Sequence, residues 1–194
     1  MYEKFIDIIN ENNGILTTKQ AVSKGISRVH LKKMTDMGLI RRLERGIYIT
    51  DIFLYDEYYI FQLKHPNSIF SYNTALYLQN MSERVPNKMD VTTKRSTNLF
   101  TYKDKINLHR VNENIFELGK IEVKTIYGNT VYAYNLERTV CDIIIKRSAI
   151  DFEVASKAIK KCVRSEHFQV NKMFEYAYKL NAYDKVKNYM EAII

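Results

Sequence analysis

Proline and glycine are scarce in this sequence, with two prolines and six glycines among 194 residues. This scarcity excludes a collagen-like fibre and an array of Gly- or Pro-rich repeats, and long flexible linkers are not expected. Hydrophobic residues make up 46% of the chain and charged residues 27%, which is ordinary globular composition. A chain of this length has room for one large domain or two small ones with a core of useful size.

Cysteine is also rare, and long apolar runs are missing. Cys141 and Cys162 cannot form a disulfide framework or a zinc site by themselves. The densest apolar stretch, residues 140–145, is interrupted by Asp142 and falls short of the roughly 20 residues that span a bilayer. Glu3 stands where a secretory signal carries only bases. We therefore expect a reduced, cytoplasmic protein that binds no membrane, no metal and no other cofactor.

Basic residues outnumber acidic ones. The 30 Lys and Arg residues against 22 Asp and Glu give a formal net charge of +8 at pH 7. The surplus is concentrated, because residues 24–45 contain seven bases and only two acids. A basic segment of this kind favours contact with the phosphates of a nucleic acid.

The first 50 residues predict three short helices followed by a hairpin. Apolar spacing, cap residues and glycines set the expected boundaries. The expected elements are a helix over residues 2–11, an apolar link at 15–16, a helix capped by Thr17 or Thr18 and stopped by Gly25, a helix over 28–37 capped by Ser27, and strands on either side of a turn at 44–46. This order predicts a winged helix-turn-helix.

The third helix has the pattern of a helix that binds in the DNA major groove. Leu31 and Met34 share one side, and a stripe on the other side includes Lys32 and Lys33. Arg28, at the N-terminal end, is expected to bind a guanine. Phosphate contacts are expected from the start of the second helix and from the arginines of the hairpin. The predicted DNA-binding residues are Thr17, Thr18, Lys19, Ser27, Arg28, His30, Lys32, Lys33, Arg41, Arg42 and Arg45.

The rest of the chain predicts a second domain, so the fold class is α+β. We expect domains at 1–52 and 53–194, the second with a connector helix at 53–66, a strand-rich part at 68–134 that forms a small mixed or antiparallel sheet, and a helical end at 135–194. Asn135 and Asp151 are expected to cap helices there. A second basic cluster, Lys157, Lys160, Lys161 and Arg164, is typical of a solvated helix face, and a phosphate or partner contact is the alternative.

Three groups of motifs resemble one known family. The first is GILTT at 14–18, GISR at 25–28, GLIRR at 38–42 and RGIY at 45–48; the second is SYNTALYL at 71–78 with ERVP at 83–86; the third is NLERTVCDI at 135–143. In this order they are similar to the AbiEi-type antitoxins and transcriptional regulators.

The resemblance implies a type IV toxin–antitoxin system of abortive infection, that is, phage defence. The antitoxin would repress its own operon by binding inverted repeats in promoter DNA, and would counteract a nucleotidyltransferase-like toxin without requiring a direct complex. The motif residues Tyr72, Arg84, Arg138 and Asp142 suggest an antitoxin surface. Arg138 and Asp142 are four residues apart on one helix, so they also fit an internal ion pair. We favour the ion pair over the antitoxin surface.

Two other functions remain open at this point. One is a winged-helix transcription factor whose C-terminal domain dimerises or senses a ligand. The other is a Mg²⁺-dependent restriction-type nuclease, in which Asp90 and the E-x-K residues Glu122 and Lys124 would form the site. The sequence does not decide between a monomer and a dimer, and we expect no enzymatic activity.

Overall fold

The computed structural model describes residues 2–97, 99, 102–146 and 152–193. The chain folds into two compact units, one of residues 1–63 with 125–129 and the other of residues 64–124 with 130–194. The fold is mixed α+β, as the sequence predicts. The first unit extends past residue 52, where a boundary was predicted, because Ile60 packs with Ile47 and Ile49 in a shared core.

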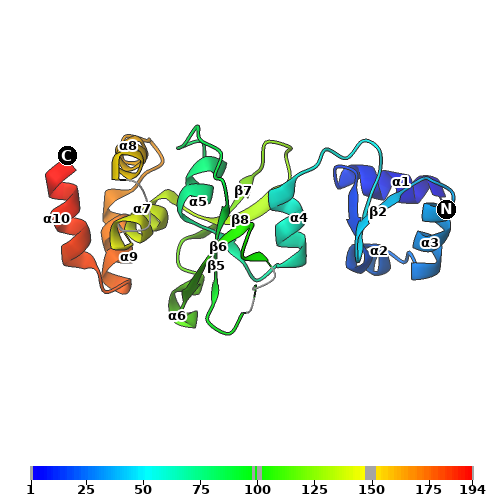
Figure 1. Cartoon of the computed structure of the whole chain (residues 1–194), viewed down its shortest axis with the longest axis horizontal. Coiled ribbons are helices and arrows are strands. Elements are labelled where there is room, and N and C mark those ends of the chain that lie inside the picture. The colour runs from blue at the N-terminus through cyan, green and yellow to red at the C-terminus, as the bar shows by residue number, and fades with distance from the viewer. Residues whose placement is uncertain (1, 98, 100–101, 147–151, 194) are drawn as a thin grey trace. The chain divides into compact units, whose positions relative to one another are not determined.

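The first unit contains four helices and three strands. They are α1 (Tyr2–Glu11), β1 (Ile15–Thr17), α2 (Thr18–Ser23), α3 (Arg28–Asp36), β2 (Arg41–Glu44), β3 (Ile47–Ile49) and α4 (Glu57–Lys64), shown in Figure 1. The strands form an antiparallel sheet in the order β1-β3-β2. Three helices with this sheet are the architecture of a winged helix-turn-helix. The prediction that residues 15–16 form only an apolar link is wrong, because they belong to a strand that pairs with β3.

The two faces of β1 explain why a three-residue strand is stable. Leu16 is buried in the core that α1, α2 and α3 share, and Ile15 is buried on the opposite face with Ile60 of α4. Adjacent strand residues point to opposite faces, so β1 joins two apolar clusters. The connector helix α4 begins at Glu57, later than predicted.

Asp56 explains both this start and the grouping of residues 125–129 with the first unit. The Asp56 carboxylate accepts a hydrogen bond from the backbone N–H of Tyr59, at 3.1 Å, in the first turn of α4. Its other oxygen accepts hydrogen bonds from the Thr125 hydroxyl and the Asn129 amide, at 2.5 and 2.9 Å. The fully buried carboxylate is therefore satisfied by Tyr59 nearby and by two groups that lie 69 and 73 residues away in sequence.

The second unit consists of a mixed sheet with helices. Its elements are β4 (Ile69–Phe70), α5 (Tyr72–Leu78), β5 (Met89–Lys94), β6 (Ile106–Val111), α6 (Glu113–Phe116), β7 (Lys120–Lys124), β8 (Thr130–Tyr134), α7 (Leu136–Ile145), α8 (Phe152–Val163), α9 (Val170–Lys179) and α10 (Tyr183–Ile193). The strand order is β6-β5-β4-β8-β7. The pairs β5–β6 and β4–β8 are parallel, and β4–β5 and β7–β8 are antiparallel.

Helix α7 is the centre of this unit, and every residue from 136 to 144 is buried. It packs with α5, α8, α9 and α10 in one apolar cluster, and Figure 1 shows these helices gathered around it. The side-chain oxygen of Asn135 accepts a hydrogen bond from the backbone N–H of Arg138, so the predicted cap is confirmed. Asp151, the other predicted cap, lies outside the described residues.

Strands β7 and β8 form an antiparallel hairpin, in which Lys124 pairs with Thr130 and residues 125–129 connect the strands. The short helix α6 was not predicted. Within the described part of the chain, no helix combines the length and the apolar character needed to cross a membrane.

Candidate nucleic-acid interface

Helix α3 is fixed in the first unit by its inner face and its N-cap. Leu31 and Met34 are buried among the side chains of the α1–α3 core. Ser27 caps the helix by accepting a hydrogen bond from the His30 N–H, at 3.3 Å, and its hydroxyl also lies 2.8 Å from Nδ1 of the His30 ring. The cap therefore orients His30 and leaves its Nε2 as the ring nitrogen that can meet a ligand.

The outer face of α3 is exposed along its whole length. This face consists of Val29, Lys32, Lys33 and Asp36, and Arg28 is exposed beside it at the first helical position. Val29 was not among the predicted DNA-binding residues, although its side chain is 64% exposed between the cations. A small apolar side chain at this place can contact a thymine methyl group. The helical spacing of residues 29, 32, 33 and 36 is the signal in the sequence that places Val29 on this face.

The wing, formed by β2, β3 and the turn at residues 45–46, places its arginines on different faces. Arg42 lies opposite Tyr48, whose side chain packs against the α1–α3 core, so Arg42 shares the face of α3. Arg41 lies opposite Ile49, which belongs to the core on the α4 side. Directly paired residues point to the same face of a sheet. Arg41 and Arg42, which were predicted together as DNA-binding residues, therefore lie on opposite faces of the sheet.

The remaining wing arginine lies at the tip. Arg45 is exposed, and Gly46 follows it with φ +82°, a left-handed conformation that allows the tight turn. The Nε of Arg42 donates a hydrogen bond to the backbone oxygen of Glu44, at 3.3 Å, which orders the approach to this tip. Arg42 therefore lies on the α3 side of the wing, and Arg45 is exposed at its tip.

The start of α2 offers less to a phosphate than predicted. The Thr17 side chain and the Gln20 side chain form a capping box, in which each bonds the other residue's backbone N–H. The backbone N–H of Thr18 donates to the carbonyl oxygen of Gly46 in the wing turn, at 2.8 Å. The N–H groups of Thr18 and Gln20 are therefore occupied, and the exposed Lys19 carries the potential phosphate contact.

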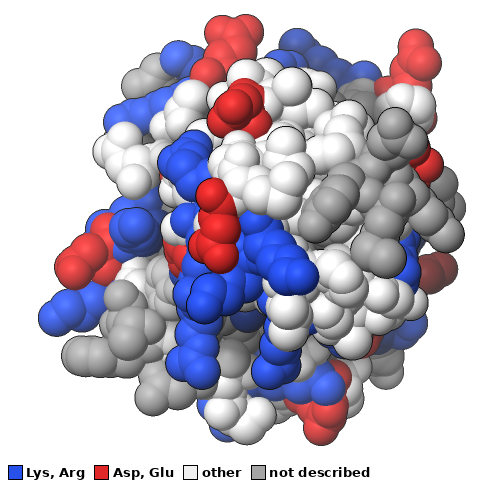
Figure 2. Space-filling model, turned by 90° about the vertical axis from the view of Figure 1, so that its right-hand side faces the viewer, with Lys and Arg blue, Asp and Glu red and all other residues white. Residues whose placement is uncertain are grey.

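Figure 2 shows Lys and Arg side chains gathered in a cluster with few acidic side chains among them. The cations exposed on α3, on the α3 side of the wing and at the tip of the wing are Arg28, Lys32, Lys33, Arg42 and Arg45. Neighbouring cations on a rigid scaffold match the regular phosphates of a duplex.

Three of the four predicted antitoxin residues lie in the interior of the second unit. Arg138 has no exposed surface, and Tyr72 and Asp142 are also buried, whereas Arg84 is exposed. These four residues therefore do not form one contact surface. The alternative reading of an internal ion pair between Arg138 and Asp142 agrees with their placement.

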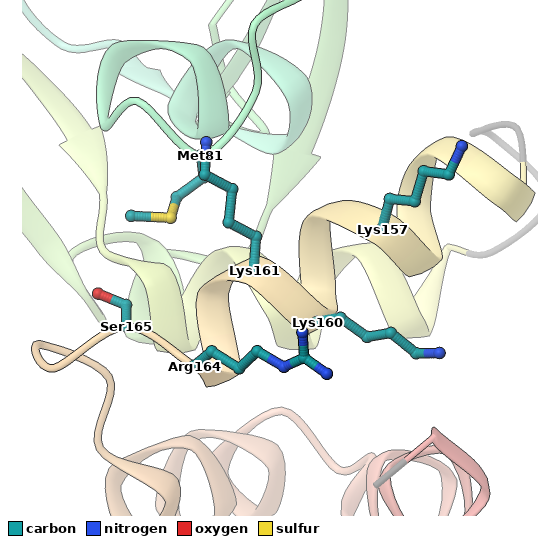
Figure 3. A pocket seen from close by; sticks show the side chains of 6 residues that line it. All are labelled: Met81, Lys157, Lys160, Lys161, Arg164 and Ser165. Atoms are coloured by element: carbon teal, nitrogen blue, oxygen red, sulfur yellow. The ribbon is translucent and has the colours of Figure 1, made fainter.

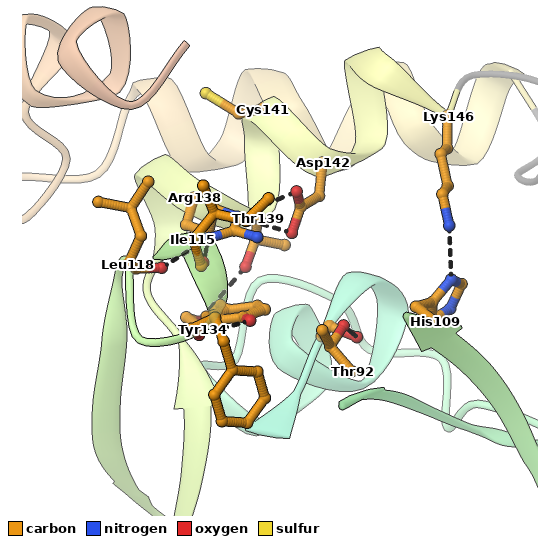
Figure 4. Close-up of polar contacts among 12 residues, drawn as sticks. Thr92, His109, Ile115, Leu118, Tyr134, Arg138, Thr139, Cys141, Asp142 and Lys146 are labelled. Atoms are coloured by element: carbon orange, nitrogen blue, oxygen red, sulfur yellow. Dashed lines mark hydrogen bonds and ion pairs between the residues drawn. The ribbon is translucent and has the colours of Figure 1, made fainter. Parts of the chain in front are cut away.

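The Arg138 guanidinium connects four parts of the unit (Figure 4). Its Nε donates to both oxygens of Asp142, at 3.0 and 3.1 Å, and its Nη1 donates to the carbonyl oxygens of Ile115 and Leu118, both at 2.8 Å. The guanidinium also stacks on the Tyr134 ring, 4.3 Å from its centroid. Burial raises the pKa of the Asp142 carboxyl, and Arg138 acts in the opposite direction. This network anchors α7 to the chain between β6 and β7.

A second polar cluster surrounds His109, also visible in Figure 4. His109 Nε2 lies 2.9 Å from the buried Asp90 carboxylate, and Nδ1 lies 3.3 Å from Lys146 Nζ. The His109 ring stacks on Tyr72 with centroids 4.0 Å apart. Tyr72 has φ +45°, a strained value for a bulky residue, and burial raises the pKa of its hydroxyl. Neither Asp90 nor His109 was predicted to belong with Tyr72.

The predicted nuclease site is not assembled. Asp90 lies on β5 and Glu122 on β7, and β4 and β8 run between these strands. Three strand spacings place the two strands about 14 Å apart, so their carboxylates are not on neighbouring strands, where both could bind one Mg²⁺. Lys124 Nζ donates to the Thr130 hydroxyl, at 2.7 Å. The nuclease reading is therefore wrong for this structure.

Comparison with known proteins supports the resemblance. Residues 5–50 match the family model described as "Transcriptional regulator, AbiEi antitoxin", which confirms the resemblance over the helices and the wing. No curated protein matches the chain by sequence. The crystal structure of the RV2827C protein from Mycobacterium tuberculosis is similar, with a TM-score of 0.57 and 9% identity over 93% of this chain and 74% of that chain. At this identity the likeness shows the fold alone.

Proposed function

We propose that this chain, whose residues 5–50 match the AbiEi antitoxin family of transcriptional regulators, represses its own operon and acts as the antitoxin of a type IV pair. It would bind inverted repeats in promoter DNA, with α3 in the major groove and the wing on the adjacent backbone. Its second unit would serve to counteract a nucleotidyltransferase-like toxin, which completes a phage-defence system of the abortive-infection type.

One observation carries the DNA-binding part of this proposal. The outer face of α3 is exposed and basic, while its inner face is locked into the core and its N-terminus is capped by Ser27. A rigid helix with Arg28, Lys32 and Lys33 free to meet DNA has the placement that base contacts require, because small displacements weaken hydrogen bonds to base edges. The family match covers these same residues.

The antitoxin part rests on the family match and on the second unit having its own fold. Its central helix α7 is held by the Arg138 network rather than exposed for contact. A mutation at Arg138 or Asp142 is therefore expected to act on antitoxicity through unfolding of the unit, and surface residues such as Arg84 test direct contact. Loss of rescue without loss of folding in an Arg84 variant would place that residue in the antitoxin function.

The first experiment measures binding of the purified chain to the DNA upstream of its own gene and to a scrambled duplex of equal length, across a salt series. We expect tighter binding to the upstream DNA, with affinity falling steeply as salt increases, since phosphate contacts release counterions. Equal and weak binding to both duplexes would contradict the repressor assignment and leave the winged helix as a protein-interaction module.

The second experiment separates an antitoxin from a simple transcription factor. The chain is co-expressed with the toxin encoded beside it, each from a promoter that the chain does not regulate. We expect growth to be restored, also by an Arg28→Ala variant that no longer represses, because the second unit carries the antitoxicity. Continued growth arrest with a folded, DNA-binding chain would support a transcription factor with a dimerising or ligand-sensing second unit.

A further inference from the structure

The second basic cluster of the chain lines a groove in the second unit. Lys157, Lys160, Lys161 and Arg164 project from α8 and from the residue after its end, as Figure 3 shows. Their spacing of three, four and seven residues places them along one side of the helix. From the first to the last, this row of cations extends about 10 Å along the helix axis, at 1.5 Å per residue.

The groove has the size of a ligand site. It has a volume of about 560 Å³ and is lined by these four cations together with Met81 and Ser165, which we call the α8 groove. Binding sites for small ligands commonly range from about 300 to 1,000 Å³. None of its six described lining residues is an Asp or Glu, so the ligand that fits it is an anion.

The opposite side of α8 holds this row in place. Ile159 and Cys162 are buried in the core of the unit, and Ala155 and Ala158 lie beside them. The helix cannot rotate about its axis without exposing these side chains, so the cations are directed outward. Lys161 Nζ also donates to the carbonyl oxygen of Asn80, at 2.8 Å, which ties the helix to the chain segment that bears Met81.

Two cations of the groove, Lys160 and Arg164, lack an acidic partner among the described residues. Within the described part of the chain, neither Lys160 nor Arg164 makes an ion pair with an acidic residue. Like charges three and four residues apart on a helix repel one another. An anion with several charges would relieve this repulsion.

The composition of the groove favours phosphate over an acidic protein surface. Three of the four cations are lysines, which are depleted from protein–protein interfaces, and Met81 is the one apolar residue in the described lining. No aromatic residue is present in that lining to stack on bases, so contact would be made with phosphates and not with bases. The Ser165 hydroxyl can add a hydrogen bond to a phosphate oxygen.

We propose that the α8 groove binds a ligand with several adjacent phosphate groups. The row of four cations matches a run of phosphates, which a free oligophosphate, the tail of a nucleoside triphosphate or the backbone of a nucleic acid would each supply. This site is separate from the winged helix and does not depend on the function proposed for either unit.

Isothermal titration of the full-length chain with inorganic tripolyphosphate tests the proposal. The groove variant carries K160E and R164E, and the control variant carries K105E and K179E, both exposed lysines elsewhere in the second unit. Each pair lowers the net charge by four. We expect binding at least tenfold weaker in the groove variant and within twofold of the unchanged chain in the control. Equal loss in both variants would overturn the site.

Further arms identify the source of the phosphates and the class of ligand. A nucleoside triphosphate and a 20-nucleotide RNA are titrated alongside tripolyphosphate, and the ligand whose affinity falls most in the groove variant is the natural source. Hexaglutamate is the control for charge alone, and binding as tight as tripolyphosphate would contradict a phosphate site. Circular dichroism checks folding, and K160Q/R164Q replaces the groove variant if the charge reversal unfolds the chain.

Discussion

Arg28 and Arg138 each lie within the first three residues of a helix, but burial gives them opposite roles. Arg28 is exposed at the start of α3, where its guanidinium is free to donate two hydrogen bonds to a guanine. Arg138 is fully buried at the start of α7, and its Nε and Nη1 donate hydrogen bonds to Asp142, Ile115 and Leu118. A motif in the sequence identifies such residues as important, but only the fold separates a contact residue from an internal anchor.

Replacing Arg28 by Ala tests the base-contact role. We expect affinity for the upstream DNA to fall by about 1–3 kcal/mol, or roughly 5- to 150-fold, because a bidentate contact to a base is lost. Affinity for scrambled DNA should change by about threefold or less, since the lost contact is specific for a base and not for a phosphate. Fluorescence anisotropy with both duplexes measures the two affinities. An equal loss on both would assign Arg28 to the backbone.

The two cysteines are expected to be unreactive in the folded chain. Cys141 and Cys162 are fully buried, and burial raises the pKa of each thiol to about 12. Because the thiolate is the nucleophile, almost none is present at pH 8. Titration with a thiol reagent should label under about a tenth of the thiols in native buffer, and both after unfolding in urea. Fast labelling of the native chain would contradict the burial of α7 and α8.

At the scale of elements, local signals were readable and long-range pairing was not. Thr17, Ser27 and Asn135 cap helices as predicted, because a cap depends on residues within one helical turn. The strand-rich part predicted at 68–134 contains β4 to β8. The order of the sheet depends on partners far apart in sequence, such as Phe70 opposite Ala133, and no local pattern specifies that contact.

In the candidate nucleic-acid interface, too, local features could be predicted from the sequence and long-range contacts could not. Helical spacing predicted which side chains of α3 are exposed, because that spacing is a property of one helix. The separation of Arg41 from Arg42 depends on their register with β3 and on which core lies against each face. Likewise, the N–H group of Thr18 at the start of α2 is occupied by the carbonyl oxygen of Gly46, nearly thirty residues away.

Gly119 tests how closely the Arg138 network is packed. Gly119 has φ +81°, and a Cβ added there would lie 2.6 Å from the Cβ of Arg138. Gly128 is the control, because it has φ +80° and a Cβ added there would have no neighbour within 4 Å. Gly128→Ala should therefore cost about 1–2 kcal/mol of unfolding free energy, from backbone strain alone. Gly119→Ala should cost about 1–3 kcal/mol more, because the added carbon overpacks the core. Urea unfolding compares the variants, and equal costs would contradict the close packing.

At the scale of the whole molecule, the two units differ in where they expose cations and in what their cores contain. The first unit exposes cations on a small rigid scaffold, and it is the part that the family model matches. The second unit has its own core around α7 and its own basic row on α8. The net charge of +8 therefore combines cations of both units, and a salt effect on DNA binding must be assigned to particular residues.

The salt dependence of DNA binding distinguishes the two faces of the wing. Arg45→Ala should weaken binding to upstream and scrambled DNA alike, and should reduce the slope of log K against log salt by about 0.9, the value for one lost phosphate contact. Arg41→Ala removes the same charge from the α4 side of the sheet, so its slope should match that of the unchanged chain. Anisotropy titrations at five salt concentrations give the three slopes. If Arg41→Ala flattens the slope as much as Arg45→Ala, then DNA contacts both faces of the wing, and the assignment of its binding face from strand register is wrong.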